Sequence, residues 1–335
     1  MQYGKIARRA IIPILLGVTL ATFVYETENT ENNPPPTNTP IHEYRMALTP
    51  EATIEAYTAT PSATPSPTLT PSPTATPTPS VSYDFLELQK TLEGKVKGYE
   101  ESTGMNIALA VTDLQTRKTI SVDGDEVHRT GCVINQFPVY LIAEEAQKGN
   151  LDPNEMDLYI RNSVDRSNPA STGVFLTHYF GSEAEGVRRV QDWMNRHGIE
   201  GTYNHVPLHG SENWTDNVIT ANETNEVLSK LYPGELFNPE WTDYVMDVLT
   251  YDYFYYGIPA GVDIDATVSH KIGYFWDSDG WVHGDTGIVI FPADGGREKA
   301  FAISIYTENG AAEFSIAPVA QDLTRTAYDY FKTKY

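Results

Sequence analysis

The stretch that decides the fold is residues 266–307, which read ATVSHKIGYFWDSDGWVHGDTGIVIFPADGGREKAFAISIYT. It contains three runs rich in β-branched and aromatic residues, at 266–274, 281–291 and 299–307. Short turns rich in Asp and Gly separate the runs. Strands joined by such short connections pair with their neighbours, so the stretch predicts an antiparallel meander of three strands.

The segments on either side of this meander add two strands and several helices. Apolar residues recur at spacings of three and four over 85–99 and 319–330, which indicates an amphipathic helix at each end of the domain. Strands are expected at 106–113 and 118–122, and a helix at 133–148. We therefore expect an α+β fold, a five-stranded antiparallel sheet flanked by N- and C-terminal helices plus a helical lobe. A ligand cleft is expected between the sheet edge and the lobe.

The first 82 residues differ in composition from the rest. In residues 1–25, positive charges precede an apolar run, which is typical of a signal peptide or of a membrane anchor; a buried N-terminal helix is a third interpretation. Residues 26–82 hold twelve of the 22 prolines, interleaved with Thr and Ser, and predict a disordered Pro/Thr-rich stalk. Residues 83–335 form the domain proper. This order predicts an extracytoplasmic protein, secreted or membrane-anchored at the cell surface.

Charge and cysteine content exclude several classes of protein. The 335 residues include 23 Lys and Arg against 45 Asp and Glu, a net charge of −22. So acidic a chain is poorly suited to nucleic acid or anionic lipid, and we expect membrane contact only through the N-terminal segment. The single cysteine, Cys132, excludes an intramolecular disulfide and a cysteine-clustered metal site. No cofactor and no metal are expected.

Several strings within residues 85–335 together resemble the serine β-lactamase and penicillin-binding protein superfamily, in particular its class A β-lactamase form. The strings 269–274 (SHKIGY) and 284–289 (GDTGIV) look like the family's late strand pair, and 258–262 (IPAGV) and 148–152 (KGNLD) also fit. The family has three signatures, which are Ser-x-x-Lys at a helix start, Ser-Asp-Asn in the helical lobe and Lys-Thr-Gly on a late strand. The resemblance implies the class A fold and acyl chemistry on β-lactams or peptides.

The first signature is changed at both of its reactive positions. The string 132–135 reads CVIN where the family has Ser-x-x-Lys. Cys132 thus occupies the nucleophile position, whereas Asn135 replaces the base lysine and cannot accept a proton. A helix N-terminus and nearby cations are expected to favour the thiolate of Cys132. A buried, unreactive cysteine and an intermolecular disulfide are the alternatives.

The second signature has become Arg166-Ser167-Asn168, with Arg166 in place of the relay serine. Arginine cannot relay a proton at neutral pH. A shift of this alignment would restore a hydroxyl to the site, because Ser163 and Ser167 are close in sequence. Arg166 pairing with a carboxylate such as Asp165 is the alternative interpretation. Asn168 is expected to hold a substrate amide.

The third signature has become Lys271-Ile272-Gly273. The resemblance implies that Lys271 offers a cation to a substrate carboxylate, while Ile272 lacks the hydroxyl that would assist it. The family's deacylating glutamate has no clear counterpart, and residues 212–215 (ENWT) are a weak match. The ligand-binding residues expected on this basis are Ser167, Asn168, Lys271, Ile272 and Gly273.

Other residues have simpler interpretations. His205, His209 and His283 with Asp285 match no metal motif, and His270 is expected to be structural. The aromatic tract at 251–256 suggests loop packing, with a glycan or peptide rim as the alternative.

The changed signatures predict no efficient β-lactam hydrolysis, because loss of one member of a catalytic unit removes most of its rate. We expect an impaired serine hydrolase-like domain that binds a peptidoglycan peptide or a surface protein in the old cleft. The alternatives are an acyl hydrolase or transferase that uses Cys132 as its nucleophile, and a purely structural surface module. Whether the chain is an enzyme is open at this point.

Overall fold

In a computed structural model of the chain, the described residues are 85–205, 216–250, 255–313 and 315–335. Their α-helices are α1 (Phe85–Thr103), α2 (Gln136–Gln147), α3 (Asp157–Asp165), α4 (Pro169–Phe180), α5 (Glu183–Arg196), α6 (Ala221–Leu231), α7 (Pro239–Thr250) and α8 (Ile316–Lys334). Their strands are β1 (Asn106–Asp113), β2 (Lys118–Val122), β3 (Val127–Arg129), β4 (Val218–Thr220), β5 (Thr267–Asp277), β6 (Gly280–Pro292) and β7 (Glu298–Gly310). Short 3₁₀ turns are η1 (Gly131–Asn135), η2 (Pro153–Glu155), η3 (Pro259–Gly261) and η4 (Asp294–Gly296).

The predicted leader or anchor, 1–25, and the predicted stalk, 26–82, lie outside the described residues. Among the helices that are described, none combines the length and the apolar character that crossing a membrane requires.

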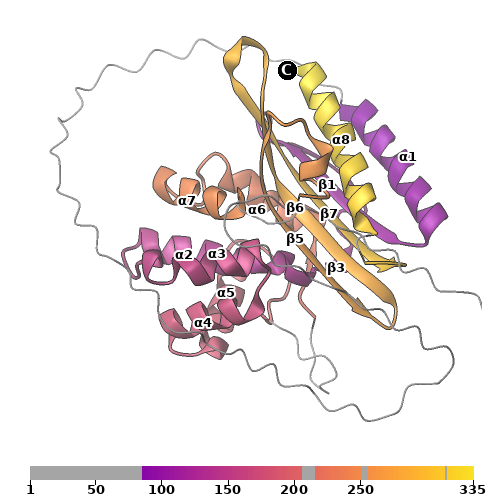
Figure 1. The fold of residues 1–335 in the computed structure, drawn as a ribbon. Coiled ribbons are helices and arrows are strands. Elements are labelled where there is room, and N and C mark those ends of the chain that lie inside the picture. Colours follow the sequence, from indigo (N-terminus) through magenta and orange to yellow (C-terminus); the bar gives the residue numbers. More distant parts are fainter. Residues whose placement is uncertain (1–84, 206–215, 251–254, 314) are drawn as a thin grey trace, which may run out of the picture. The chain divides into compact units, whose positions relative to one another are not determined.

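Five strands form one antiparallel sheet in the order β2-β1-β7-β6-β5 (Figure 1). The bounds of β1 and β2 are those expected from the sequence, and those of the meander differ from expectation by one to three residues at each end. The predicted fold class is confirmed. A second sheet, made of β3 and β4, was not predicted, because three-residue strands are too short to show a period of two.

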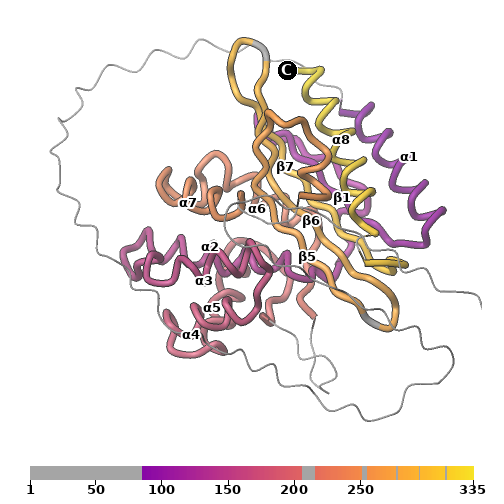
Figure 2. Tube along the Cα trace, in the orientation of Figure 1, coloured from indigo at the N-terminus to yellow at the C-terminus, as the bar shows by residue number. Residues whose placement is uncertain are grey.

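Helices cover both faces of the five-stranded sheet. Figures 1 and 2 show α1 and α8 side by side on one face, with the lobe of α2 to α7 on the other. Side chains alternate along a strand, so each face has its own apolar core. On β7, Phe301 and Ile303 join the core under α1 and α8, while Ala302 and Tyr306 join the core of the lobe.

The same alternation of side chains applies to β5, which forms one edge of the sheet. Ser269 and Lys271 point toward the lobe, where the Ser269 hydroxyl lies 2.7 Å from that of Thr250 in α7. His270 points the opposite way, toward α8, where it meets Asp285 of β6. The edge strand therefore presents alternate residues to two separate environments.

The predicted helix at 133–148 begins differently in the structure. Its first residues form the 3₁₀ turn η1, and the α-helix starts only at Gln136. Pro138 has no N–H to donate to the carbonyl of Ile134, four residues earlier, so the α-helical ladder cannot extend back over that turn. Cys132 therefore lies in a short 3₁₀ turn, and the expected N-terminus of a long helix is not at this residue.

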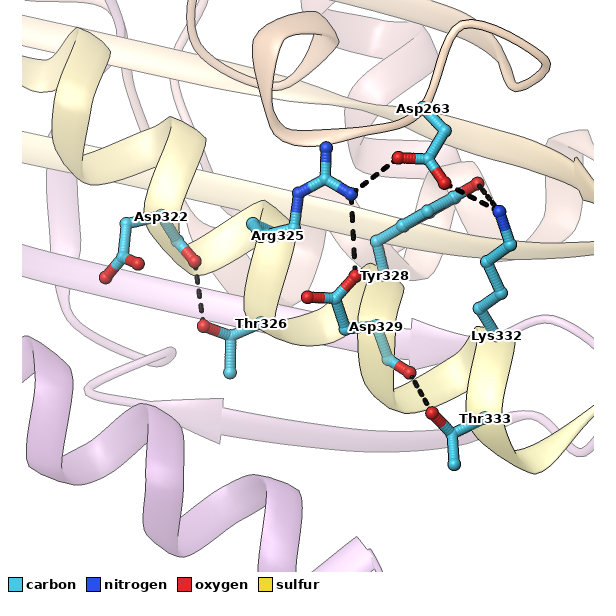
Figure 3. A network of polar contacts seen from close by, with 8 residues as sticks. All are labelled: Asp263, Asp322, Arg325, Thr326, Tyr328, Asp329, Lys332 and Thr333. Atoms are coloured by element: carbon cyan, nitrogen blue, oxygen red, sulfur yellow. Dashed lines mark hydrogen bonds and ion pairs between the residues drawn. The ribbon is translucent and has the colours of Figure 1, made fainter.

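A polar network fastens the loop after η3 to α8 (Figure 3). The carboxylate of Asp263 accepts hydrogen bonds from Lys332 at 2.6 Å and from Arg325 at 2.9 Å. The hydrogen bond from Lys332, followed by that from Arg325, lowers the pKa of Asp263. Exposed ion pairs of this kind add little stability, but they fix the path of the chain just before β5.

Candidate functional site

The backbone of η1 lies directly against β5. Gly131 has a φ of +53°, and a Cβ there would lie 2.8 Å from the amide nitrogen of Tyr274. A Cβ on Gly273 would collide with the amide nitrogens of Cys132 and Val133. Only glycine permits this approach, which places the Cys132 backbone beside the edge strand.

A cavity of about 130 Å³ opens beside Cys132. Its lining is mostly apolar and includes the partly exposed Cys132. The lining residues are Gly131, Cys132, Ile134, Asn135, Pro169, His205, Asp216, Asn217, Tyr274 and Phe275. Pockets for drug-sized ligands measure about 300–1,000 Å³, so this cavity suits one residue or one acyl group of a ligand.

Asn135 is buried in the wall of this cavity, with 3% of its surface exposed. Its amide nitrogen lies 3.4 Å from the carbonyl oxygen of Ser163 in α3, a long hydrogen bond. A side-chain amide neither gains nor loses a proton near neutral pH. Asn135 can therefore orient a ligand, but it cannot act as a base for Cys132.

Lys271 is completely buried, which the sequence did not indicate. Its ammonium donates hydrogen bonds to the hydroxyl of Ser167 at 2.5 Å and to the carbonyl oxygen of Ile272 at 2.6 Å. The structure thus gives this cation internal partners and no solvent exposure, where a substrate-facing cation was expected. Hydrogen bonding of this kind is what makes a buried charge tolerable.

The hydroxyl that meets Lys271 is that of Ser167, one residue after the position assigned to the relay serine by sequence. Ser167 has a φ of +48°, and this turn separates the end of α3 from the start of α4. The side chain of Arg166 is 62% exposed and lies 3.3 Å from Asp165, the surface pairing that was the alternative interpretation. Asn168 caps α4, its side chain accepting a hydrogen bond from the amide of Ser171.

Two of the residues expected in the site point elsewhere or act through the backbone. Ile272 is fully buried and is not among the residues that line the cavity. Gly273 has no side chain to offer to a ligand. Its role is to let the backbone of η1 approach the edge strand closely. The weak glutamate match at 212–215 and His209 lie outside the described residues, as does most of the aromatic tract at 251–256.

The remaining histidines lie in separate places. His270 and Asp285 form a buried pair at 2.8 Å, and Asp285 also accepts a hydrogen bond from the amide of Ile258. His283 is buried with neither ring nitrogen hydrogen-bonded, and burial lowers its pKa to about 4. Within the described part of the chain, no group of His, Cys, Asp and Glu side chains could hold a metal ion.

Sequence reasoning missed the position of His205, which lines the same cavity as Cys132. Its side chain contacts Glu183 and the backbone of Pro169, which are 22 and 36 residues away along the chain. No local pattern signals contacts of this range, so only the fold reveals them.

The comparisons with known proteins agree with this architecture. Residues 182–331 match the family model described as the Beta-lactamase enzyme family. A penicillin G acyl-enzyme complex of a PBP-A mutant superposes with a TM-score of 0.60 at 16% identity, covering 74% of this chain and 97% of that one. The described part of this chain has a class A β-lactamase-like fold.

Two further solved structures give the same result for the class A-like domain. TLA-1 extended-spectrum β-lactamase superposes with a TM-score of 0.61 at 14% identity, covering 73% of this chain and 99% of that one. A β-lactamase from Xanthomonas campestris superposes with a TM-score of 0.61 at 11% identity, covering 72% and 98%. A search among curated proteins finds no match. The family match includes Lys271 but begins after Cys132, Asn135 and Arg166.

Proposed function

We propose that this class A-like domain binds a peptide-like ligand, such as a cell-wall peptide, beside Cys132 and does not hydrolyse β-lactams efficiently. The observation that carries the proposal is Asn135, an amide buried in the cavity wall where the family has its base. The cavity beside Cys132 has room for an acyl group, while Asn135, at the position of the family's base, cannot accept the proton of a nucleophile.

The state of Lys271 supports the same proposal. Its ammonium is buried and donates to Ser167 and to a backbone carbonyl, so a ligand carboxylate would have to displace internal hydrogen bonds to reach it. The partly exposed cavity wall of Tyr274 and Phe275 offers apolar contact instead. A ligand held mainly by apolar contacts and backbone hydrogen bonds fits this surface.

Binding to purified peptidoglycan fragments tests the proposal with the full chain. Phe275→Ala, which removes an aromatic side chain from the cavity wall, is expected to weaken binding about tenfold or more. Ile264→Ala, at a fully exposed position that is not among the cavity residues, is the matched control and should bind normally. Equal binding by both variants, or turnover of penicillin G at an ordinary enzymatic rate, would overturn the proposal.

A second candidate function is acyl transfer through Cys132, favoured by its partly exposed position in the cavity beside the backbone of Gly273 and Tyr274. The sulfur would attack the β-lactam carbonyl, a thioester bond would form as the ring C–N bond breaks, and the thiol proton would pass to the ring nitrogen. Amides of Cys132 and of the edge strand would donate hydrogen bonds to the oxyanion in this step.

Intact mass after incubation with penicillin G separates the two candidates. A mass increase equal to the drug that is absent from Cys132→Ala would establish acylation at this residue. A folded protein that binds peptidoglycan fragments and forms no adduct would support the binding function alone.

A further inference from the structure

A second and larger hollow adjoins the cavity beside Cys132. This groove measures about 670 Å³ and is open to solvent, and two of its lining residues, Pro169 and His205, also line the cavity. The cavity itself has room for one residue or one acyl group, so a peptide bound there has to continue outside it. The shared wall places the groove where the next part of such a peptide would lie.

The floor of the groove is one side of α4. Four of the lining residues follow the helical spacing i, i+3, i+4 and i+7, and these are Ala170, Gly173, Val174 and Thr177. Their side chains are small, which leaves space above the helix, and Val174 is 42% exposed. With Met156, just before α3, they give the groove a mainly apolar lining.

One carboxylate borders this apolar floor. Glu183, the first residue of α5, is 54% exposed, and its Oε1 lies 2.5 Å from Nδ1 of His205. Its other oxygen, Oε2, lies over α4, because a Cβ added to Gly173 would be 3.0 Å from that oxygen. The groove therefore combines an apolar surface with one carboxylate oxygen that faces it.

The charges around the groove favour a cationic ligand group. Among the described residues that line it, none is Lys or Arg. His178 also lines it, and the ring of His178 lies 3.0 Å from the carboxylate of Glu155. The whole chain carries a net charge of −22, so the long-range field attracts cations as well.

We propose that the groove is a second subsite for the peptide and takes a residue with an alkylammonium side chain, with Glu183 as the residue that determines this specificity. The alkyl stem packs on Ala170 and Val174, and the ammonium donates a hydrogen bond to Oε2 of Glu183. An acidic residue would be repelled there, and an apolar one would cover Oε2 without giving it a hydrogen bond. This inference deepens the proposed function and rests on it for the peptide nature of the ligand.

Binding of n-pentylammonium, which has the stem and the charge but no peptide, tests the groove by itself. Carbon NMR of the Val174 methyl groups in the full chain is the readout. We expect saturable shifts, with an affinity about fivefold higher than that for 1-pentanol, which has the same stem without the charge. No shift at Val174, or equal affinities for the two compounds, would overturn the inference, and this comparison needs no variant to fold.

Glu183→Gln removes the charge and keeps the size of the side chain. It is expected to lower the affinity for n-pentylammonium to that for 1-pentanol and to leave 1-pentanol binding unchanged, whereas a merely structural role would weaken both. Glu185→Gln, on the same helix and outside the groove, removes an equal charge and is the matched control. An equal loss in this control would assign the preference to the overall charge of the protein and overturn the role of Glu183.

Peptides then connect the groove with the cavity. The probes are alanine tetrapeptides with one lysine at each position in turn, each compared with its norleucine counterpart. At one position we expect lysine to bind about fivefold more tightly than norleucine, and Glu183→Gln to abolish the difference. Peptide binding without any preference for lysine would overturn the inference and leave the proposed function standing. Failure of peptidoglycan fragments to bind, with the ammonium preference intact, would remove the proposed function and leave the specificity of the groove.

Discussion

Two of the histidine–carboxylate pairs among the described residues, one on each side of the five-stranded sheet, differ in their access to water. On the α8 side, the side chains of His270 and Asp285 are 3% and 0% exposed. On the lobe side, His205 is 4% exposed, but its partner Glu183 is 54% exposed. Losing one partner of a pair that is sealed from water leaves the other buried and uncompensated, whereas water can hydrate the exposed carboxylate of Glu183 when its partner is changed. We therefore expect the pair on the α8 side to contribute more to stability than the pair on the lobe side.

The largest effect is expected from a substitution of Asp285, the carboxylate that is sealed from water. Asp285→Asn removes the negative charge of a fully buried carboxylate that accepts a hydrogen bond from the amide of Ile258 and pairs with His270. We expect a loss of about 4 kcal/mol in the free energy of unfolding. Urea denaturation measures it, with Glu183→Gln as the matched substitution, expected to cost under about 1 kcal/mol. Equal losses in the free energy of unfolding would show that the two pairs do not differ in their contribution to stability.

A second test concerns His283, whose buried ring nitrogens have no hydrogen-bond partner. Burial lowers the pKa of this side chain from 6.5 to about 4. Between these values the unfolded chain binds a proton that the folded chain does not, so stability is present above about pH 6.5 and falls as pH decreases. The loss approaches about 3 kcal/mol below about pH 4.

The matched variant for this residue is His283→Phe, which keeps an aromatic ring against Trp281 and cannot titrate. Comparing denaturation of the two proteins at several pH values isolates the contribution of His283 from that of the carboxylates. Parallel stability curves would contradict a neutral buried imidazole.

A smaller effect is expected at Gly273, where the edge strand meets η1. A methyl group there would press on the backbone of Cys132 and Val133, which cannot rotate away as a side chain could. We expect Gly273→Ala to cost about 2 kcal/mol and to change the alkylation rate of Cys132. Gly94→Ala, at an open position in α1 with nothing within 4 Å, is the control and should be neutral or slightly stabilising.

The smallest effect is expected at Arg166. Its ion pair with Asp165 is exposed, so Arg166→Ala should change stability by about 0.3 kcal/mol and leave peptidoglycan binding unaltered. Ser167→Ala removes a hydrogen-bond acceptor from the buried ammonium of Lys271 and should cost about 1 kcal/mol. A larger effect at Arg166 than at Ser167 would show that the arginine, and not the serine, belongs to the site.

Much of the fold could be predicted from the sequence because the strands and the two terminal helices show strong periodic patterns of apolar residues. The hairpin at 106–113 and 118–122 was predicted with its bounds, since its apolar residues and its turn are local signals. The start of the helix at 133–148 was wrong, because the effect of Pro138 reaches back one turn and was not followed to its consequence.

The site was less predictable than the fold. Lysine is seldom fully buried, so nothing in the string around Lys271 indicated that its ammonium would be enclosed. Whether Arg166 or Ser167 faces that ammonium depends on one positive φ between α3 and α4. His205 contacts the starts of two helices that are distant from it in sequence, and only tertiary packing brings them together.

The neighbouring positions of α1 and α8 have a mechanical consequence. The described chain enters the fold through α1, which packs against α8 and is linked to it by the ion pair of Lys95 with Asp322 at 2.7 Å. A pull applied at Phe85 would therefore load the contacts of α1 with α8 and with β2 before it loads the strands in the middle of the sheet. The cavity of Cys132 is on the opposite side of the sheet, so tension on the amino-terminal end would reach it last.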